Sequence, residues 1–168
     1  MRLGLPLGLA TLHKYGSAFT PAALFANGEA GAWYTVPNDS LGPFTDTSHK
    51  VINHSNTWNP TTNSFDLSSL EIGDVLILRL SAYVTTASSN IAVFGKLRMA
   101  IASGINYDLP FYASNIKHAG KHLASATTMI YIGNAETRDY PAQIMASTDT
   151  GGVGIETDGW LIISLCRG

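Results

Sequence analysis

The stretch Glu71-Ile-Gly-Asp-Val-Leu-Ile-Leu-Arg-Leu-Ser-Ala-Tyr-Val-Thr-Thr86 carries the clearest structural signal in the chain. Its Gly73-Asp74 pair is typical of a turn, and the run that follows is rich in β-branched and aromatic residues and lacks proline. From Leu78 onward apolar and polar positions alternate, which indicates a strand with one face toward a core. Before that point Val75 and Ile77 make the second face apolar as well. We therefore predict a central strand that is covered on both faces at its beginning.

Composition limits the classes of partner. Of the 168 residues, 45% are hydrophobic but only 13% are charged, against about 25% charged residues in an average soluble domain. Few charges with ordinary hydrophobicity suggest that much of the surface is covered by other chains. The net charge is −2, and no cluster of Lys and Arg exists, so we expect no nucleic-acid partner. No apolar run reaches the roughly 20 residues that span a bilayer, so we also expect no membrane partner.

Two regions differ in character. Residues 1–46 are rich in Gly, Pro, Ala and Leu and show no strand-length alternation. They allow at most one short helix, capped by Thr20 and ended by Asn27-Gly28. Residues 47–168 contain several strand-like runs separated by turn signals. The sequence therefore predicts an all-β sandwich over residues 47–168, preceded by an irregular arm over residues 1–46.

The alternation also assigns faces. We predict a buried core of Leu78, Leu80, Val84, Leu97, Met99, Ile130, Ile132, Leu161, Ile163 and Leu165. Val75, Ile77 and Phe94 point away from that core, and a second copy of the chain is the simplest cover, so they are the predicted subunit interface. The arm holds large apolar residues that it cannot bury by itself, and these are the predicted contacts to a partner: Leu24, Phe25, Trp33, Tyr34 and Phe44.

Motifs for chemistry are weak. His118 and His122 have helical metal-ligand spacing, but Gly120 between them makes a helix a poor expectation. There is no nucleophile elbow and no local carboxylate pair, and Cys166 lies in an apolar run. We predict a non-enzymatic protein with no catalytic residue, metal or cofactor.

Aromatic residues in the expected loops allow a binding function. Trp58, Tyr107 and Tyr112 are typical of side chains that stack on sugar rings. The alternative is that they pack at the rim of the sandwich or in a subunit contact.

The order of short motifs resembles structural proteins of tailed-bacteriophage virions. The motifs are Leu24-Phe25-Ala26-Asn27-Gly28-Glu29-Ala30-Gly31-Ala32-Trp33-Tyr34, Leu70-Glu71-Ile72-Gly73-Asp74, Asp108-Leu109-Pro110-Phe111, Tyr131-Ile132-Gly133-Asn134, Arg138-Asp139-Tyr140-Pro141-Ala142 and Asp158-Gly159-Trp160-Leu161-Ile162. The resemblance implies a jelly-roll body of the tumour-necrosis-factor-like type, usually a homotrimer.

The same resemblance implies a function and a location. The expected role is a non-enzymatic virion protein that decorates or cements the capsid and contacts the major capsid protein or another virion protein. It would occupy the virion surface, after assembly in the host cytoplasm. The alternative from another class is a receptor- or carbohydrate-binding module of a phage fibre, and a jelly-roll enzyme is a more distant third.

Overall fold

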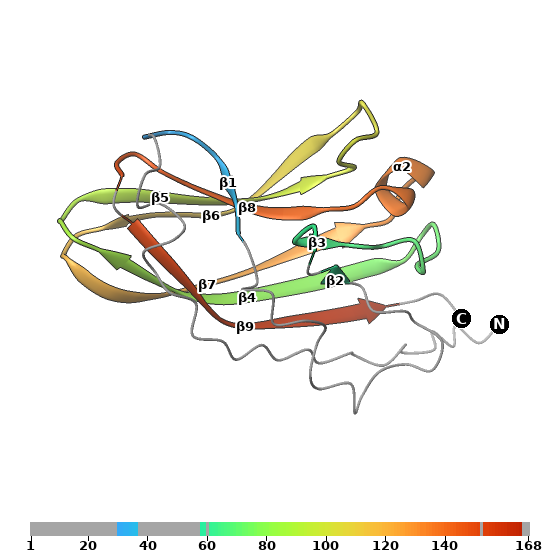
Figure 1. Ribbon diagram of the computed structural model, residues 1–168. Coiled ribbons are helices and arrows are strands. Elements are labelled where there is room, and N and C mark those ends of the chain that lie inside the picture. The colour runs from blue at the N-terminus through green and yellow to red at the C-terminus, as the bar shows by residue number, and fades with distance from the viewer. Residues whose placement is uncertain (1–29, 37–57, 60, 152, 166–168) are drawn as a thin grey trace.

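The computed structural model describes residues 30–36, 58–59, 61–151 and 153–165, and gives the backbone alone for Trp58 and residues 155–165. Two antiparallel sheets lie face to face, with strand orders β1-β8-β5-β6 and β7-β4-β9 (Figure 1). A two-stranded sheet, β2-β3, lies beside them. The elements are β1 (Tyr34–Thr35), β2 (Trp58–Asn59), β3 (Ser64–Phe65), β4 (Val75–Thr86), β5 (Ile91–Met99), β6 (Tyr107–Ile116), β7 (Gly120–Tyr131), α2 (Ala135–Asp139), β8 (Gln143–Thr148) and β9 (Val153–Leu165).

Strand β4 is the middle strand of its sheet, as the sequence predicts. It pairs with β7 on one side and with β9 on the other over its full length. The turn before it is built as expected: Gly73 has a φ of 105°, and the buried Asp74 carboxylate accepts a hydrogen bond from the Glu71 N–H at 2.8 Å. A glycine at this positive φ avoids the strain that a side chain would bring.

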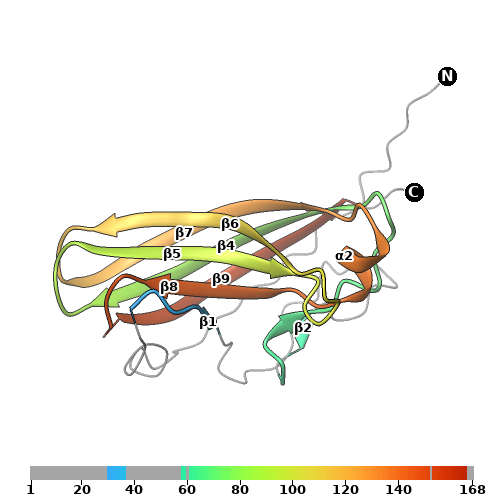
Figure 2. The same ribbon diagram turned by 90° about the horizontal axis from the view of Figure 1, so that it is seen from above.

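The connections make the sandwich a jelly roll. From β4 onward only the β5–β6 connection stays within one sheet, whereas β4–β5, β6–β7, β7–β8 and β8–β9 each cross from one sheet to the other. Figure 2 shows the two layers from above, with their strands running roughly along one another. The predicted all-β sandwich is therefore confirmed.

The core follows the predicted alternation closely. Of the predicted core residues whose side chains the structure describes, Leu78, Val84, Leu97, Met99, Ile130 and Ile132 are at most 2% exposed. Leu80 is only partly buried and lines a small cavity between the sheets. The side chains of Leu161, Ile163 and Leu165 lie outside the described set.

The predicted subunit interface is split by the topology. Val75 and Ile77 lie on β4 and are half-buried, whereas Phe94 lies on β5 in the other sheet and is 40% exposed. The prediction that they share one outer surface was wrong. Strands β4 and β5 belong to opposite sheets. Side chains that point away from the core on these two strands therefore lie on opposite outer surfaces of the sandwich.

The predicted arm boundary also needs correction. Tyr34 and Thr35 form an edge strand that pairs with Ala146 and Met145 of β8. Val36 is 3% exposed and belongs to the core. At least residues 34–36 are therefore part of the sandwich, while Leu24, Phe25, Phe44 and the predicted helix lie outside the described residues.

Two short elements complete the described structure. Residues 58–65 contain the β2–β3 hairpin, in which Trp58 pairs with Phe65. The charged segment after Asn134 is a helical turn, α2, because the Asn134 side chain caps it by accepting a hydrogen bond from the Thr137 N–H at 2.9 Å.

Candidate functional site

The outer face of the four-stranded sheet carries a group of polar and aromatic side chains that contact one another. Cross-strand pairing sets them in rows. Arg98 of β5 stands between Gln143 of β8 and Asp108 of β6, and Lys96 stands in the next row beside Met145. We call this surface the Arg98 face and define it by seven residues: Trp33, Thr35, Phe94, Lys96, Arg98, Asp108 and Gln143.

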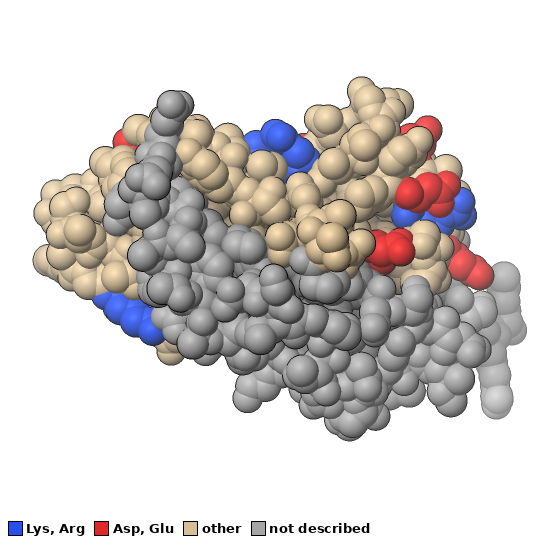
Figure 3. Space-filling view, in the orientation of Figure 1, with Lys and Arg blue, Asp and Glu red and all other residues tan. Residues whose placement is uncertain are grey.

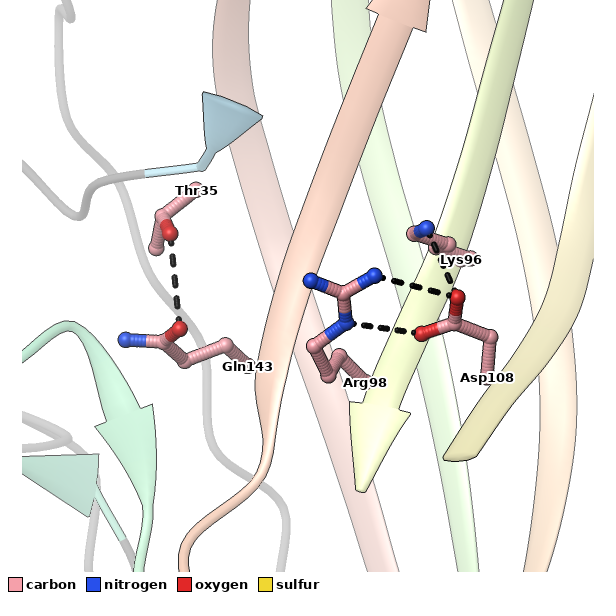
Figure 4. Close-up of polar contacts among 5 residues, drawn as sticks. All are labelled: Thr35, Lys96, Arg98, Asp108 and Gln143. Carbon is pink, nitrogen blue, oxygen red and sulfur yellow. Dashed lines mark hydrogen bonds and ion pairs between the residues drawn. The ribbon is translucent and has the colours of Figure 1, made fainter. Parts of the chain in front are cut away.

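The Asp108 carboxylate is the centre of this face. Arg98 donates two hydrogen bonds to this carboxylate, from Nε to Oδ1 at 2.9 Å and from Nη2 to Oδ2 at 3.2 Å. Lys96 Nζ donates to Oδ2 at 2.8 Å. The close-up in Figure 4 shows both cations approaching the carboxylate from β5. The two-pronged contact fixes the plane of both groups, which a single point charge would not do.

These contacts change the protonation behaviour of Asp108. Hydrogen bonds from Arg98, with a further contribution from Lys96, lower the pKa of the Asp108 carboxyl from 3.8 to about 2. The same contact raises the pKa of Arg98 above its ordinary value. Asp108 is therefore a permanent acceptor near neutral pH, since its proton is lost well below that range.

Aromatic rings flank the charged group. Lys96 Nζ lies 3.9 Å from the centroid of the Trp33 ring, although the Lys96 side chain is only 8% exposed. Trp33 remains 37% exposed and Phe94 40% exposed. The face thus presents two partly open rings in addition to a fixed ion cluster.

Gln143 connects this face to a groove at the end of the sandwich. Thr35 Oγ1 donates to Gln143 Oε1 at 3.4 Å, and Gln143 Nε2 donates to the Thr62 carbonyl at 2.8 Å. The groove has a volume of about 530 Å³. Seven of its nine described lining residues are of polar type, and the lining consists of Asn59, Thr62, Ser64, Asp66, Ser68, Ile101, Asp139, Pro141 and Gln143.

The three aromatic residues predicted for sugar contact do not meet at one place. Tyr112 pairs with Gly95 of β5, turns inward and packs partly buried against the core. Tyr107, 39% exposed, lies at the other end of β6 and shares a hydrogen bond of 2.9 Å with Thr137. The Trp58 backbone lies in β2, and its side chain is outside the described set. Of the three, only Tyr107 offers a described, open ring.

The residues that form the Arg98 face were missed as a group, although the alternation of β5 already turned Lys96 and Arg98 outward. The sequence could have indicated Asp108 as a neighbour of Arg98, because a turn around Gly104 would pair β5 with β6 as a hairpin. The exact register was not available from the sequence, because it depends on which residues close the turn between Met99 and Tyr107. Trp33 was predicted to contact a partner chain, which stays a prediction; within the chain its ring lies over Lys96 and is 37% exposed.

Metal and membrane features were sought over the described ranges. These residues contain no group of three or more His, Cys, Asp or Glu placed to hold a metal ion. His122 Nε2 lies 2.7 Å from the carbonyl oxygen of His118. No described helix has the length and apolar character needed to cross a bilayer.

Charge is sparse over the rest of the described surface. Figure 3 shows most of the visible Asp and Glu at the end of the sandwich that carries α2, where Arg138 and Asp139 form an ion pair at 2.6 Å, whereas Lys and Arg are spread over separate places. A binding partner must therefore be recognised by shape, stacking and individual hydrogen bonds rather than by a broad electrostatic field.

Comparisons with known proteins give fold-level similarities only. No family model and no curated protein matches the chain. Among solved structures, the CBM22-2 xylan-binding domain of Paenibacillus barcinonensis Xyn10C aligns at 11% identity and a TM-score of 0.41, over 60% of this chain and 67% of that domain.

Two further solved structures show the same kind of likeness. The CBM22-1–GH10 modules of Clostridium thermocellum endo-1,4-β-D-xylanase 10B, complexed with xylohexaose, align at 11% identity and a TM-score of 0.45, over 95% of this chain and 29% of that one. The module CBM6cm-2 of Cellvibrio mixtus lichenase 5A, in complex with cellotriose, aligns at 11% identity and a TM-score of 0.29. The alignment covers 83% of this chain and 94% of that module. Because every TM-score is below 0.5, we base no functional inference on these similarities.

Proposed function

We propose that this chain is a non-enzymatic binding module whose ligand is a carbohydrate and whose binding surface is the Arg98 face. One observation carries the proposal. The rings of Trp33 and Phe94 are each more than a third exposed on the same sheet face as the fixed Arg98–Asp108 pair, and all four residues lie on or next to strands of one sheet.

The chemistry of this face suits a sugar. An aromatic ring offers an apolar surface to the C–H side of a pyranose, and charged planar groups give directional hydrogen bonds to its hydroxyls. Arg98 has five N–H donors, and two of its nitrogens are engaged with Asp108. Its remaining donors and the acceptor oxygens of Asp108 can meet neighbouring hydroxyls. Strands hold these groups more rigidly than loops would, which lowers the entropic cost of binding.

The state of Asp108 favours binding over hydrolysis. A general acid for glycoside cleavage needs a carboxyl that stays protonated near neutral pH and a second carboxylate on the opposite side of the sugar. Asp108 has the opposite tendency, because Arg98 and Lys96 lower its pKa to about 2. We accordingly assign it the role of a hydrogen-bond acceptor.

The setting we propose comes from the sequence resemblance to virion proteins. A carbohydrate-binding jelly roll on a phage fibre would recognise a polysaccharide of the host surface. Capsid decoration, contact with the major capsid protein and assembly as a homotrimer stay predictions of that resemblance. Mass spectrometry of purified virions tests them, since a decoration protein would be present in a few hundred copies and a fibre protein in a handful.

Affinity measurements on the full chain test the binding proposal. Titration calorimetry against xylohexaose, cellotriose and bacterial surface polysaccharides should find at least one ligand. Phe94→Ala and Arg98→Ala should each weaken its binding by about tenfold or more, as expected for loss of a central contact.

Ile72→Ala is the matched control, because Ile72 is 50% exposed and precedes β4 in the other sheet. It should bind like the parent chain. A ligand whose affinity is unchanged by both Phe94→Ala and Arg98→Ala would contradict the assignment of this face, and a panel without any ligand would contradict the proposed function.

A further inference from the structure

Strand β7 presents a long open edge. It runs from Gly120 to Tyr131 and is the outermost strand of the three-stranded sheet within the described ranges. One edge of β7 pairs with β4 over twelve residues, so alternate N–H and C=O groups on the other edge point away from the sheet. Such an edge is a template for another strand.

Strand β6, an edge strand of the other sheet, carries features that oppose pairing with another strand, whereas β7 carries none of these features. Strand β6, the edge of the other sheet, contains Pro110 and has its register broken at Phe111, which lies between the paired residues Pro110 and Tyr112. A proline and a bulge both interrupt a ladder and are common devices against edge-to-edge pairing. Strand β7 contains no proline, and its pairing with β4 proceeds without a register shift.

The outward side chains of β7 add an apolar surface to this edge. Leu123 is 62% exposed, Met129 67% and Tyr131 58%. Between them Ser125 and Thr127 are small and exposed. On β4 the side chains opposite Met129 and Tyr131 are Ile77 and Val75, both half-buried, so the apolar surface continues across the sheet.

We propose that β7 pairs antiparallel with β7 of a second copy of this chain, about a two-fold axis through Ala126. This register sets Leu123 against Met129 of the partner subunit, so two large exposed apolar side chains cover each other. It also sets Ser125 against Thr127 of the partner subunit. Each pair occurs twice, because a two-fold interface uses the same patch on both copies.

The pattern of β7 identifies a second copy as the occupant. The apolar residues lie near both ends of the strand and the small residues lie in the middle, so the strand is complementary to itself when reversed. The pairing joins the two three-stranded sheets into one continuous sheet. It closes with two copies, and therefore differs from the homotrimer that the sequence resemblance implies.

Oligomeric state tests this proposal directly. Sedimentation equilibrium on the full chain at micromolar concentration should give a dimer of the 17.9 kDa protein. Met129→Lys should raise the dimer dissociation constant by about tenfold or more, because a charge would face Leu123 of the partner subunit. Ile105→Lys is the matched control, since Ile105 is also 67% exposed but lies in the turn between β5 and β6. Circular dichroism confirms that both variants are folded.

Cysteine cross-linking tests the register. In a Cys166→Ser background the chain has no other cysteine. Opposite residues of an antiparallel pair have Cα atoms about 4.5–5.5 Å apart, within the range of a disulfide. A mixture of the Ser125→Cys and Thr127→Cys chains should cross-link under oxidation, and neither chain alone should do so.

Three results would overturn the proposal. They are a monomer, an oligomer that Met129→Lys leaves intact, and an oligomer in which the mixed cysteine variants fail to cross-link. A trimer that resists Met129→Lys would point instead to the three-fold assembly. Binding of carbohydrate by the Arg98 face is measured separately, so failure of one proposal leaves the other standing.

Discussion

The ammonium nitrogen of Lys96 lies 3.9 Å from the centroid of the Trp33 ring. The contact joins the segment before β1 to the middle of β5, two parts of the chain that are far apart in sequence. Lys96 is 6% exposed overall, which is unusual for a lysine and requires compensation for the lost hydration. Trp33 on one side and Asp108 on the other supply it.

Loss of the Lys96 charge should therefore reduce stability. Lys96→Met keeps the apolar stem but removes both the contact with the Trp33 ring and the ion pair with Asp108. We expect the free energy of unfolding to fall by about 1–3 kcal/mol, measured by urea denaturation at pH 7. Lys117→Met, at an exposed turn position, is the control and should change it by less than about 0.5 kcal/mol. Equal effects in the two variants would show that Lys96 is not held by its partners.

The ion cluster should also make stability depend on pH in the acid range. The pKa of Asp108 is about 2 in the folded chain, against an ordinary value of 3.8. A lowered pKa means that the folded state favours the ionised carboxyl, so this stabilisation is present above pH 4 and is lost as the pH falls toward 2.

Urea denaturation between pH 6 and pH 2 measures this effect. Between pH 4 and pH 2 the unmodified chain should lose more stability than Asp108→Asn, whose side chain does not titrate. Other carboxyls act in both proteins and cancel in the difference. Parallel curves for the two proteins would show that Asp108 has the same pKa folded and unfolded.

The sandwich core gives a graded prediction. Leu78→Ala should cost about 2–5 kcal/mol, because Leu78 is 2% exposed and its loss leaves a cavity. Leu80→Ala should cost less, since Leu80 is only partly buried and borders an existing cavity of about 40 Å³ between the sheets. Ile105→Ala, at a side chain 67% exposed, should stay within about 0.5 kcal/mol. Chemical denaturation of the three variants should give this order, and a Leu80 effect above that of Leu78 would contradict their order of burial.

The candidate site divides into parts that the sequence could and could not predict. The outward direction of Phe94, Lys96 and Arg98 follows from the period of two along β5, and the sequence shows it. That Asp108 faces Arg98 depends on the register set by the turn between Met99 and Tyr107, and farther along the same two strands the register shifts beside Gly95. The shift has a packing cause: a side chain at Gly95 would lie 3.2 Å from the Phe111 ring, so glycine there allows the two strands to approach around the extra residue.

By itself, the sequence determined the class of the fold and the inner and outer faces of its long strands. Those properties are local, because side chains alternate about a strand and apolar residues must leave water. The tertiary structure decided which strands share a sheet. It therefore decided that Val75 and Ile77 lie on the opposite side of the molecule from Phe94, that Val36 belongs to the core, and that Lys96 meets Trp33. These relations join residues distant in the chain, and only the pairing and crossing of whole strands brings them together.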